Sequence, residues 1–343
     1  MSKPFNIAVI GYGLGGRVFH APYISAVEGL NLAAIVSSRK DEIGKAHPNV
    51  PVVADPQTVF ADPAIDVVVI STPNASHASL ATRALEAGKH VVIDKPFAET
   101  PAEARLLMQK AKGRVLSVFH NRRWDGDFLT LKTLIADGTL GDVAYVESHF
   151  DLYRPTPSQR WREQPGPSSG SWYDLGAHLL DQALNLFGMP LAVAADIDVI
   201  RPGGVTTDYF RVLLRYQTLR VVLVGNYLAQ SDLRWVVHGS KASYIKHGLD
   251  PQQGSLVAGG AISDSGFGID PRPGHLVLPG GEEVIPPTIA GDYRAFYSGL
   301  RDCLRGVAPV PVSASDAVAV MDMLALAEKS AKERRELRLG DVL

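Results

Sequence analysis

The chain has 343 residues, 46% of them apolar, which is enough to bury two hydrophobic cores, so we expect two domains. Lysine and arginine number 34 against 36 aspartates and glutamates, and neither sign forms a long block, which argues against nucleic acid or an anionic membrane as a partner. The sequence begins with a strand-like run that leaves no room for a signal peptide, and no apolar run is long enough to span a membrane. The single cysteine, Cys303, excludes an internal disulfide and a Cys-rich zinc site. We therefore expect a cytoplasmic protein.

The N-terminal segment carries a glycine-rich turn. Gly11, Gly13 and Gly16 form a G-x-G-x-x-G pattern directly after the apolar run 7–10 and before a helical segment. The first glycine allows a tight turn, the second lets the main chain approach a pyrophosphate, and the third allows close packing of helix and strand. The free N–H groups at the helix N-terminus favour phosphate charge. Because both flanks fit, the pattern favours dinucleotide binding over a purely structural turn.

Strand and helix patterns alternate through the first 120 residues. Buried-strand runs occur at residues 32–36, 66–70, 90–93 and 115–119. A helical pattern over residues 80–87 ends at Gly88, and Thr100 with Glu103 forms a capping box at the start of another helix. Repeated β-α units predict an α/β fold with a doubly wound parallel sheet of the Rossmann type, so residues 1–122 are interpreted as the cofactor-binding domain.

The pattern changes after residue 122. Residues 144–153 alternate between apolar positions and a polar, aromatic face formed by Tyr145, Glu147, His149 and Asp151. Strand-like runs follow at 208–216, 220–228 and 234–238, and a hairpin is expected at 217–219. These neighbouring strands predict a second, α+β domain over residues 123–343 with a large open mixed or antiparallel sheet. The polar face could line the active site or an interface between copies, and the sequence leaves both open.

The end of the second predicted strand bears on the choice of nicotinamide cofactor. An NAD-preferring domain has an acidic residue about twenty positions past the glycines, where this chain has Ser37, Ser38 and Arg39. Two hydroxyls and a guanidinium can accept the 2′-phosphate of NADP. The alternative is that Arg39 and Lys40 only begin a solvated helix and Asp41 turns back to the ribose. We therefore expect NADP ahead of NAD.

Hydride transfer from an alcohol needs a proton acceptor and a charge that stabilises the developing alkoxide. The chain has neither the Tyr-x-x-x-Lys pattern of short-chain dehydrogenases nor a cysteine–histidine cluster for catalytic zinc, so no metal is expected. Lys95, in Asp94-Lys95-Pro96, follows the strand 90–93 at the sheet edge where ligands bind. An ordinary lysine between strand and loop is the alternative.

A second candidate pair lies in the later half of the chain. Asp174 and His178 are four residues apart in a helical pattern, so they share one face, and the carboxylate could orient the imidazole. Gly176 between them removes bulk, which suits close approach of a ligand. The alternative, a capping aspartate and a buried, satisfied histidine, is about equally supported by these residues alone.

These features together resemble one protein family. The glycine turn, Thr72-Pro73-Asn74 with His77, Asp94-Lys95-Pro96 and Asp174-x-x-x-His178 are similar to those of the Gfo/Idh/MocA oxidoreductases, over essentially the whole chain. Further segments resemble a bacterial subgroup of the family whose members include NADP-dependent scyllo-inositol dehydrogenases. These segments are Phe19–Pro22, Asn121–Asp125, Tyr153–Pro155, Trp161–Glu163 and Tyr173–Gly176. The family commonly has Glu-Lys-Pro where this chain has Asp94, a shorter side chain that leaves the lysine in place.

The resemblance implies a catalytic trio. His178 would accept the substrate proton, Asp174 would orient His178, and Lys95 would stabilise the alkoxide, although the sharing of acid–base work between Lys95 and His178 stays open. The cofactor is expected at these residues: Gly11, Gly13, Leu14, Gly16, Ser37, Ser38, Arg39, Thr72, Pro73, Asn74, His77, Lys95, Asn121, Arg122, Trp161 and Arg162.

The expected substrate follows from the remaining side chains. The expected lining consists of Arg123, Trp124, Asp125, Tyr153, Arg154, Tyr173, Asp174 and His178. Aromatic faces and forked donors suit a polyhydroxylated ring, so we expect an inositol or related sugar, although Trp124 and Trp172 could simply pack the domain junction. Another NADP-linked sugar or keto-sugar reductase and a non-enzymatic cofactor sensor are the alternatives, and the catalytic trio argues against the sensor. The resemblance implies a homodimer or homotetramer.

Overall fold

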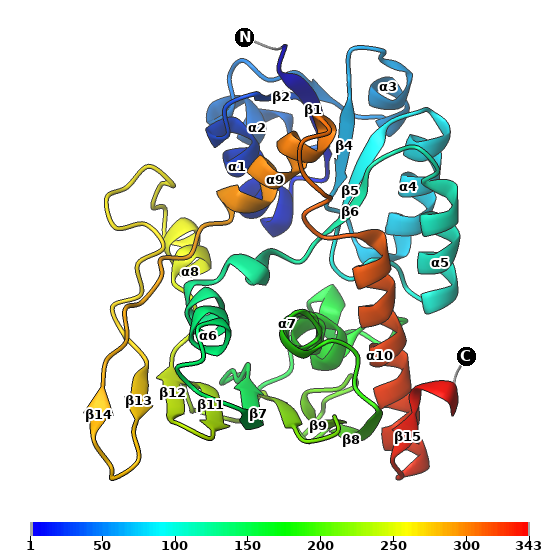
Figure 1. Ribbon diagram of the computed structural model, residues 1–343. Helices are drawn as coiled ribbons and strands as arrows, with labels where there is room; N and C mark the ends of the chain where they lie inside the picture. Colours follow the sequence, from blue (N-terminus) through cyan, green and yellow to red (C-terminus); the bar gives the residue numbers. More distant parts are fainter. Residues whose placement is uncertain (1–2, 342–343) are drawn as a thin grey trace. The chain divides into compact units, whose positions relative to one another are not determined.

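The computed structural model describes residues 3–341 and divides into two compact units (Figure 1). The N-terminal unit contains the described residues up to Asn121 together with Gln252–Phe267 and Asp292–Val318. The C-terminal unit contains Arg122–Pro251, Gly268–Gly291 and the described residues from Ala319 onward. The later chain therefore contributes two segments to the N-terminal unit, which the alternation of strand and helix patterns did not indicate.

A six-stranded parallel sheet forms the centre of the N-terminal unit, as the sequence predicted. Its strand order is β3-β2-β1-β4-β5-β6. The strands are β1 (Phe5–Ile10), β2 (Leu30–Val36), β3 (Val52–Val53), β4 (Val67–Ile70), β5 (His90–Asp94) and β6 (Leu116–Phe119). Strand β4 consists only of buried Val and Ile, the three central residues of β5 are buried Val and Ile, and all four residues of β6 are buried, because helices cover both faces of a parallel sheet. The order reverses between β1 and β4, where ligands of such folds bind.

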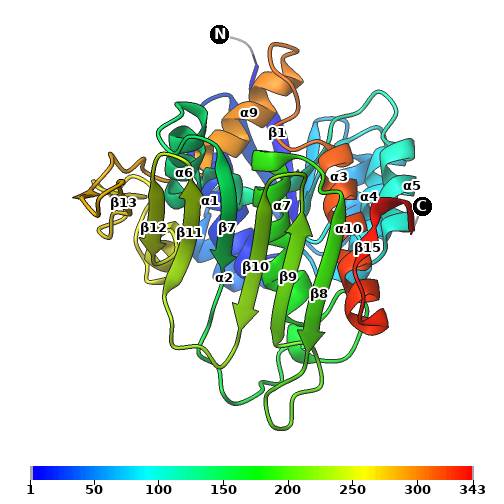
Figure 2. The same ribbon diagram turned by 60° about the horizontal axis from the view of Figure 1, so that its bottom comes forward.

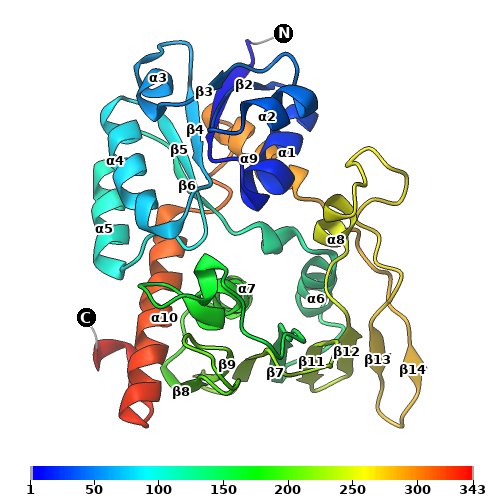
Figure 3. The same ribbon diagram turned by 180° about the vertical axis from the view of Figure 1, so that it is seen from behind.

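Helices lie on both sides of this sheet (Figure 3). On one side are α1 (Ala21–Ala26) and α2 (Lys40–Ala46), and on the other are α4 (His77–Glu86) and α5 (Pro101–Lys110). The short α3 (Pro56–Ala61) follows β3, and α8 (Gln252–Val257) comes from the later chain. The predicted capping box is present at α5, where the Thr100 side chain accepts from the Glu103 N–H at 3.2 Å and the Glu103 carboxylate accepts from the Glu99 N–H at 3.1 Å.

Helix α9 (Arg294–Leu304) completes the core of the N-terminal unit from the far end of the chain. It lies beside α1, and its Phe296 ring meets Phe119 edge-on with the ring centroids 4.8 Å apart. Tyr293, just before α9, packs against Tyr23 of α1 at 5.8 Å. Aromatic contacts of this kind contribute about 0.5–1.5 kcal/mol each beyond the apolar area that they bury.

The C-terminal unit is built on a nine-stranded mixed sheet, which confirms the predicted open sheet. Its order is β14-β13-β12-β11-β7-β10-β9-β8-β15, and β7 and β10 are parallel while their other neighbours are antiparallel. The strands are β7 (Val143–His149), β8 (Ala192–Asp198), β9 (Tyr209–Arg215), β10 (Arg220–Asn226), β11 (Leu233–Gly239), β12 (Ser243–His247), β13 (His275–Val277), β14 (Glu283–Val284) and β15 (Leu337–Arg338). The predicted hairpin at residues 217–219 joins β9 and β10.

Helices cover one face of this sheet and leave the other open (Figure 2). On the covered face are α6 (Gly126–Ala136) and α7 (Ala177–Phe187), and α10 (Ala314–Glu333) packs near the β8 edge, where Ser330 Oγ accepts from the Ala195 N–H at 3.1 Å. Val146 and Phe150 are buried on the covered face. Within residues 3–341, every helix is too short or too polar to cross a bilayer.

Candidate active site

The glycine turn after β1 has the geometry that a dinucleotide requires. Gly11 has φ +98°, and a Cβ there would collide with the carbonyl oxygen of Ser71, whereas a Cβ at Gly16 would collide with the carbonyl oxygen of Gly11. A Cβ at Gly13 would meet nothing within 4 Å. The fold itself thus demands glycine at the first and third positions, and it leaves the backbone open at the second. A diphosphate fits this open backbone at the start of the first helix.

The corner after β2 presents a guanidinium beside that turn. Arg39 Nη1 donates to the Tyr12 carbonyl oxygen at 3.3 Å, and the Arg39 N–H donates to Ser37 Oγ at 3.2 Å. The Arg39 side chain is 55% exposed, and its only ion-pair partner among the described residues is Glu42, at 3.6 Å in the next turn. Ser38 is exposed. These hydroxyl and guanidinium groups fit a ribose 2′-phosphate.

The loops after β4 and β5 are tied together by a buried histidine. His77 Nε2 faces the Thr72 carbonyl oxygen and His77 Nδ1 faces the Pro96 carbonyl oxygen, both at 2.9 Å. Thr72 Oγ1 also pairs with Ser76 Oγ at 2.6 Å. Asn74 is buried, whereas Pro73 is exposed. The segment predicted to follow the cofactor is therefore braced on the loop that contains Lys95.

Lys95 lies at the carboxyl edge of the parallel sheet, directly after β5. It is partly exposed, and its backbone N–H donates to Asp94 Oδ1 at 2.9 Å. Burial alone would raise the pKa of the Asp94 carboxyl, but His20, His77 and Lys95 around it lower that pKa below its usual range. An ionised carboxylate and a lysine ammonium thus stand together at the end of this strand.

In the C-terminal unit, Asp174 and His178 lie on consecutive helical turns. Trp172–Gly176 forms a π-helical turn that leads directly into α7. The helical expectation is thus confirmed, although the first turn is wider than an α-helix. A Cβ at Gly176 would collide with the indole of Trp172, so this glycine is needed for packing. The prediction that Gly176 makes room for a ligand is wrong for that reason.

The predicted catalytic pair sits among charged and aromatic side chains of its own unit. His178 is 7% exposed, and its ring stacks on Phe150 with centroids 6.3 Å apart. The Arg122 guanidinium carbon lies over the Phe150 ring, 4.7 Å from the ring centroid. Arg162 Nε is 3.3 Å from Asp174 Oδ1, so these two side chains form an ion pair. The Trp161 side chain lies outside the described part of the structure.

Several predicted substrate residues make ion pairs or hydrogen bonds inside the C-terminal unit. Asp125 is fully buried and accepts from Arg122 Nη1 at 2.9 Å. Arg123 forms a bidentate pair with Asp181 at 2.6–3.1 Å. The Tyr173 hydroxyl donates to Glu328 of α10 at 2.9 Å. These contacts fix residues 122–125 against α7 and fix the turn before α7 against α10. Trp124 is partly exposed, and Trp172 is fully buried.

The loop after β7 is held by an arginine that the sequence did not reveal. Arg201 is buried and donates to Asp208 at 2.8 Å, to Glu163 at 2.9 Å and to the Arg154 carbonyl oxygen at 2.8 Å. These bonds fasten the segment that carries Arg162. Tyr153, by contrast, is 56% exposed. Arg201 is 38 residues from Glu163, so no local motif could have identified it.

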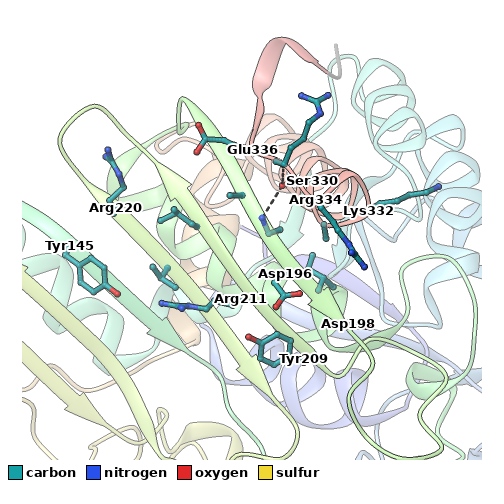
Figure 4. A pocket seen from close by; sticks show the side chains of 17 residues that line it. Tyr145, Asp196, Asp198, Tyr209, Arg211, Arg220, Ser330, Lys332, Arg334 and Glu336 are labelled. Carbon is teal, nitrogen blue, oxygen red and sulfur yellow. Dashed lines mark hydrogen bonds between the residues drawn. The ribbon is translucent and has the colours of Figure 1, made fainter.

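The polar face of β7 lies on the open side of the nine-stranded sheet, opposite Phe150 (Figure 2). Neighbouring side chains on this side line a groove of about 1170 Å³ over β8, β9 and β10 (Figure 4). The labelled lining residues are Tyr145, Asp196, Asp198, Tyr209, Arg211, Arg220, Ser330, Lys332, Arg334 and Glu336. Because Phe150 contacts His178 on the covered side, Tyr145, Glu147 and His149 do not share a face with His178. The structure thus places these three side chains on the face of the sheet opposite the one that Phe150 and His178 share.

The chain has relatives along its whole length. Residues 5–121 match the NAD-binding Rossmann fold of an oxidoreductase family, and residues 132–339 match its C-terminal alpha/beta domain. The uncharacterized oxidoreductase YdgJ of Escherichia coli (strain K12) is 50% identical, over 99% of this chain and 100% of YdgJ. The scyllo-inositol 2-dehydrogenase (NADP(+)) IolW of Bacillus subtilis (strain 168) is 37% identical, over 97% and 96%. A solved structure of the Yersinia pestis protein YPO2259 is 46% identical, with a TM-score of 0.95 and 98% of both chains covered.

Proposed function

Because the chain belongs to the Gfo/Idh/MocA family of oxidoreductases, we propose that it is an NADP-dependent dehydrogenase of a cyclic polyol, with scyllo-inositol as the first candidate substrate. The observation that carries the proposal is the likeness to IolW over nearly the full length of both chains. The exposed Arg39 beside two serines supports NADP rather than NAD. The single cysteine suits a reducing, cytoplasmic location.

The proposed reaction converts a secondary alcohol into a ketone. NADP, when bound, supplies the acceptor for the hydride that leaves the carbon atom. His178 takes the hydroxyl proton, and Lys95 stabilises the negative charge that develops on the oxygen. Asp174 orients His178, and the Arg162 guanidinium forms an ion pair with Asp174 at 3.3 Å. In the reverse direction the same proton returns from His178 to the ketone oxygen.

We also propose that the chain forms a homodimer or homotetramer through the open face of the nine-stranded sheet. Half-buried apolar side chains on three strands of this face, Leu213, Val224 and Val236, support that role. Charges of both signs surround them, among them Arg211 and Asp196, so a second copy can present complementary charges in a twofold arrangement.

The function is tested by the initial rate of nicotinamide reduction over a panel of scyllo-inositol, myo-inositol, glucose, xylose and related polyols, with NADP and with NAD. We expect activity on scyllo-inositol with NADP. Lys95→Ala and His178→Ala should each lower turnover by about two orders of magnitude or more, the usual scale for losing a general acid–base group. Lys110→Ala, which changes an exposed lysine of the same unit as Lys95, serves as the matched control.

Three outcomes are informative. Near wild-type rates in either Lys95→Ala or His178→Ala would refute the role of that residue. Activity on another sugar, or reduction of a keto-sugar with NADPH, would support the proposed oxidoreductase activity but replace scyllo-inositol as its substrate. Tight NADP binding without turnover on any compound would instead support a cofactor sensor.

A further inference from the structure

A buried imidazole faces the carboxylate that precedes Lys95. His20, in the first helix after the glycine turn, is fully buried, and its Nε2 lies 3.5 Å from Asp94 Oδ2. Its ring packs against Phe119 with centroids 4.5 Å apart. Nε2 makes no hydrogen bond within the described residues, so this buried nitrogen has the Asp94 carboxylate as its polar neighbour. A buried nitrogen in this position needs a reason, because leaving it unsatisfied costs about 1–3 kcal/mol.

Tyr297 of α9 determines which nitrogen of His20 carries the proton. The Tyr297 hydroxyl lies 2.6 Å from His20 Nδ1. Burial, with the nearby Asp94 charge, raises the pKa of Tyr297 well above its ordinary value, so the phenol keeps its proton and donates it to Nδ1. An imidazole that accepts a hydrogen bond at Nδ1 carries its proton on Nε2, the nitrogen that lies 3.5 Å from Asp94 Oδ2. Tyr297 therefore turns His20 into a donor toward the carboxylate.

The Asp94 carboxylate is bound at both oxygens. Ser71 Oγ donates to Oδ2 at 3.0 Å, and the Lys95 N–H donates to Oδ1 at 2.9 Å. The glycine turn also packs on this carboxylate, since a Cβ at Gly15 would collide with Ser71 Oγ and Asp94 Oδ2. The carboxylate thus links the backbone of Lys95 to the turn that would hold the diphosphate.

We propose that His20 and Tyr297 are positioning residues: they hold the Asp94 carboxylate ionised and oriented, and Asp94 in turn fixes the backbone of Lys95 and places a negative charge beside its ammonium group. The inference rests on the proposed role of Lys95 in the reaction. Asp94 is faced by charged or titratable groups from three further elements, namely His20, His77 of α4 and Tyr297 of α9. The row Asp94–His20–Tyr297 ends at a hydroxyl with no exposed surface, so we assign it no part in proton delivery to solvent.

The alternative role of His20 is packing alone, and the two roles predict different results for polar and apolar replacements. His20→Leu keeps the bulk and removes the donor, whereas His20→Gln retains an N–H that can reach Asp94 Oδ2. Tyr297→Phe removes only the hydroxyl that fixes the tautomer. His275→Gln, at an exposed histidine of β13, is the control for a histidine substitution. Tyr216→Phe is the control for loss of a tyrosine hydroxyl, which in that case donates to the Gly188 carbonyl oxygen.

We expect kcat of His20→Leu to fall about 10- to 100-fold, the scale of losing the orientation of a reacting group, while KM for NADP changes less than about threefold. The acid limb of its kcat profile should move to higher pH, because Asp94 without its donor protonates more easily. His20→Gln should recover most of kcat, and Tyr297→Phe should show a smaller shift in the same direction. Equal losses in His20→Leu and His20→Gln, with unmoved pH profiles, would show a packing role and overturn the inference.

A second measurement does not depend on turnover. The carboxyl carbon of Asp94, observed by NMR in protein labelled with ¹³C-aspartate and assigned with Asp94→Asn, reports its titration directly. We expect it to titrate at higher pH in Tyr297→Phe and in His20→Leu than in the wild type. If the polyol panel is silent but this shift is present, the proposed function fails and the hold on Asp94 stands. If the titration is unmoved in both variants, the inference fails whatever the activity.

Discussion

Arg39 is the side chain on which the proposed preference for NADP rests. Its side chain is 55% exposed, its guanidinium donates to the Tyr12 carbonyl oxygen of the glycine turn, and its backbone N–H donates to Ser37 Oγ. We expect Arg39→Asp to weaken NADPH binding by about 10- to 100-fold, since hydrogen bonds to a charged group contribute about 1.5–3 kcal/mol each. NADH binding should change far less, because NADH has no 2′-phosphate. Dissociation constants from nicotinamide fluorescence measure both effects.

The matched control for this change is Arg83→Asp, which alters an arginine of α4 that lies over the Phe60 ring. This variant should leave the ratio of the two dissociation constants unchanged. Equal weakening of NADPH and NADH in Arg39→Asp would show that the corner after β2 does not read the 2′-phosphate, and the preference for NADP would then have to come from elsewhere.

Alternating side chains of strand β7 point to opposite faces of the nine-stranded sheet, so one strand contributes to two different surfaces. Phe150, just after the strand, packs against His178, while His149 points to the open face. There His149 lies between two carboxylates, 3.1 Å from Glu147 and 3.2 Å from Asp151. Burial lowers the pKa of His149, but the hydrogen bonds and charges of these two carboxylates raise it by more, so the pKa of His149 lies above its ordinary value. The strand thus carries on its open face an imidazole that holds its proton more tightly than an ordinary histidine does.

The raised pKa of His149 determines how the stability of the folded protein changes with pH. Because the folded state binds the proton more tightly than the unfolded chain, the contribution of His149 is fully present below about pH 6.5 and is lost as pH rises through the folded-state pKa. His149→Gln should therefore lower Tm most at pH 6, by roughly 2–4 °C for a pair worth about 1 kcal/mol, and least at pH 9.

Thermal unfolding of both proteins from pH 5 to 9 measures this difference. His247→Gln removes an exposed histidine that pairs with Asp232, and it should show almost no pH-dependent gap, because exposed ion pairs contribute little. A gap in His149→Gln that widens toward pH 9 would have the opposite sign and would contradict the assignment.

For the whole molecule, the open sheet face is the surface that self-association would bury. Leu213 of β9 lies in the groove on this face. We expect the wild type to elute at two or four times the mass of the 36.9 kDa chain, and Leu213→Glu to shift toward the monomer because it buries an unpaired charge in the interface. Light scattering after size exclusion at micromolar concentration provides the measurement. Leu106→Glu, on an exposed position of α5, is the control, and a wild-type monomer would refute the proposal.

The sequence predicted the parts of the fold that are decided locally. Continuous apolar runs between glycines and caps identified the strands at residues 66–70 and 90–93, and the short link at residues 217–219 identified a hairpin. It also placed Lys95 at the end of its strand, where the structure has it. These features depend on neighbouring residues, so a single sequence carries them.

The features that the sequence did not predict depend on residues far apart. His20 and Tyr297 are 277 positions apart, and Arg201 anchors a loop from 38 positions away. Strand β8 is rich in alanine, and its place next to the edge of the sheet, between β9 and the two-residue β15, depends on its neighbours rather than on its own residues. None of these contacts has a local pattern.

The return of α9 to the N-terminal unit has a consequence for the order in which the protein can fold during translation. Phe296 and Tyr297 close the core around Phe119, so the first 121 residues leave the ribosome with an aromatic face that still lacks its cover. The covering residues emerge about 175 residues later, which takes roughly 9–35 s at ~5–20 residues per second. For that interval the nascent N-terminal unit exposes apolar surface of the kind that chaperones bind.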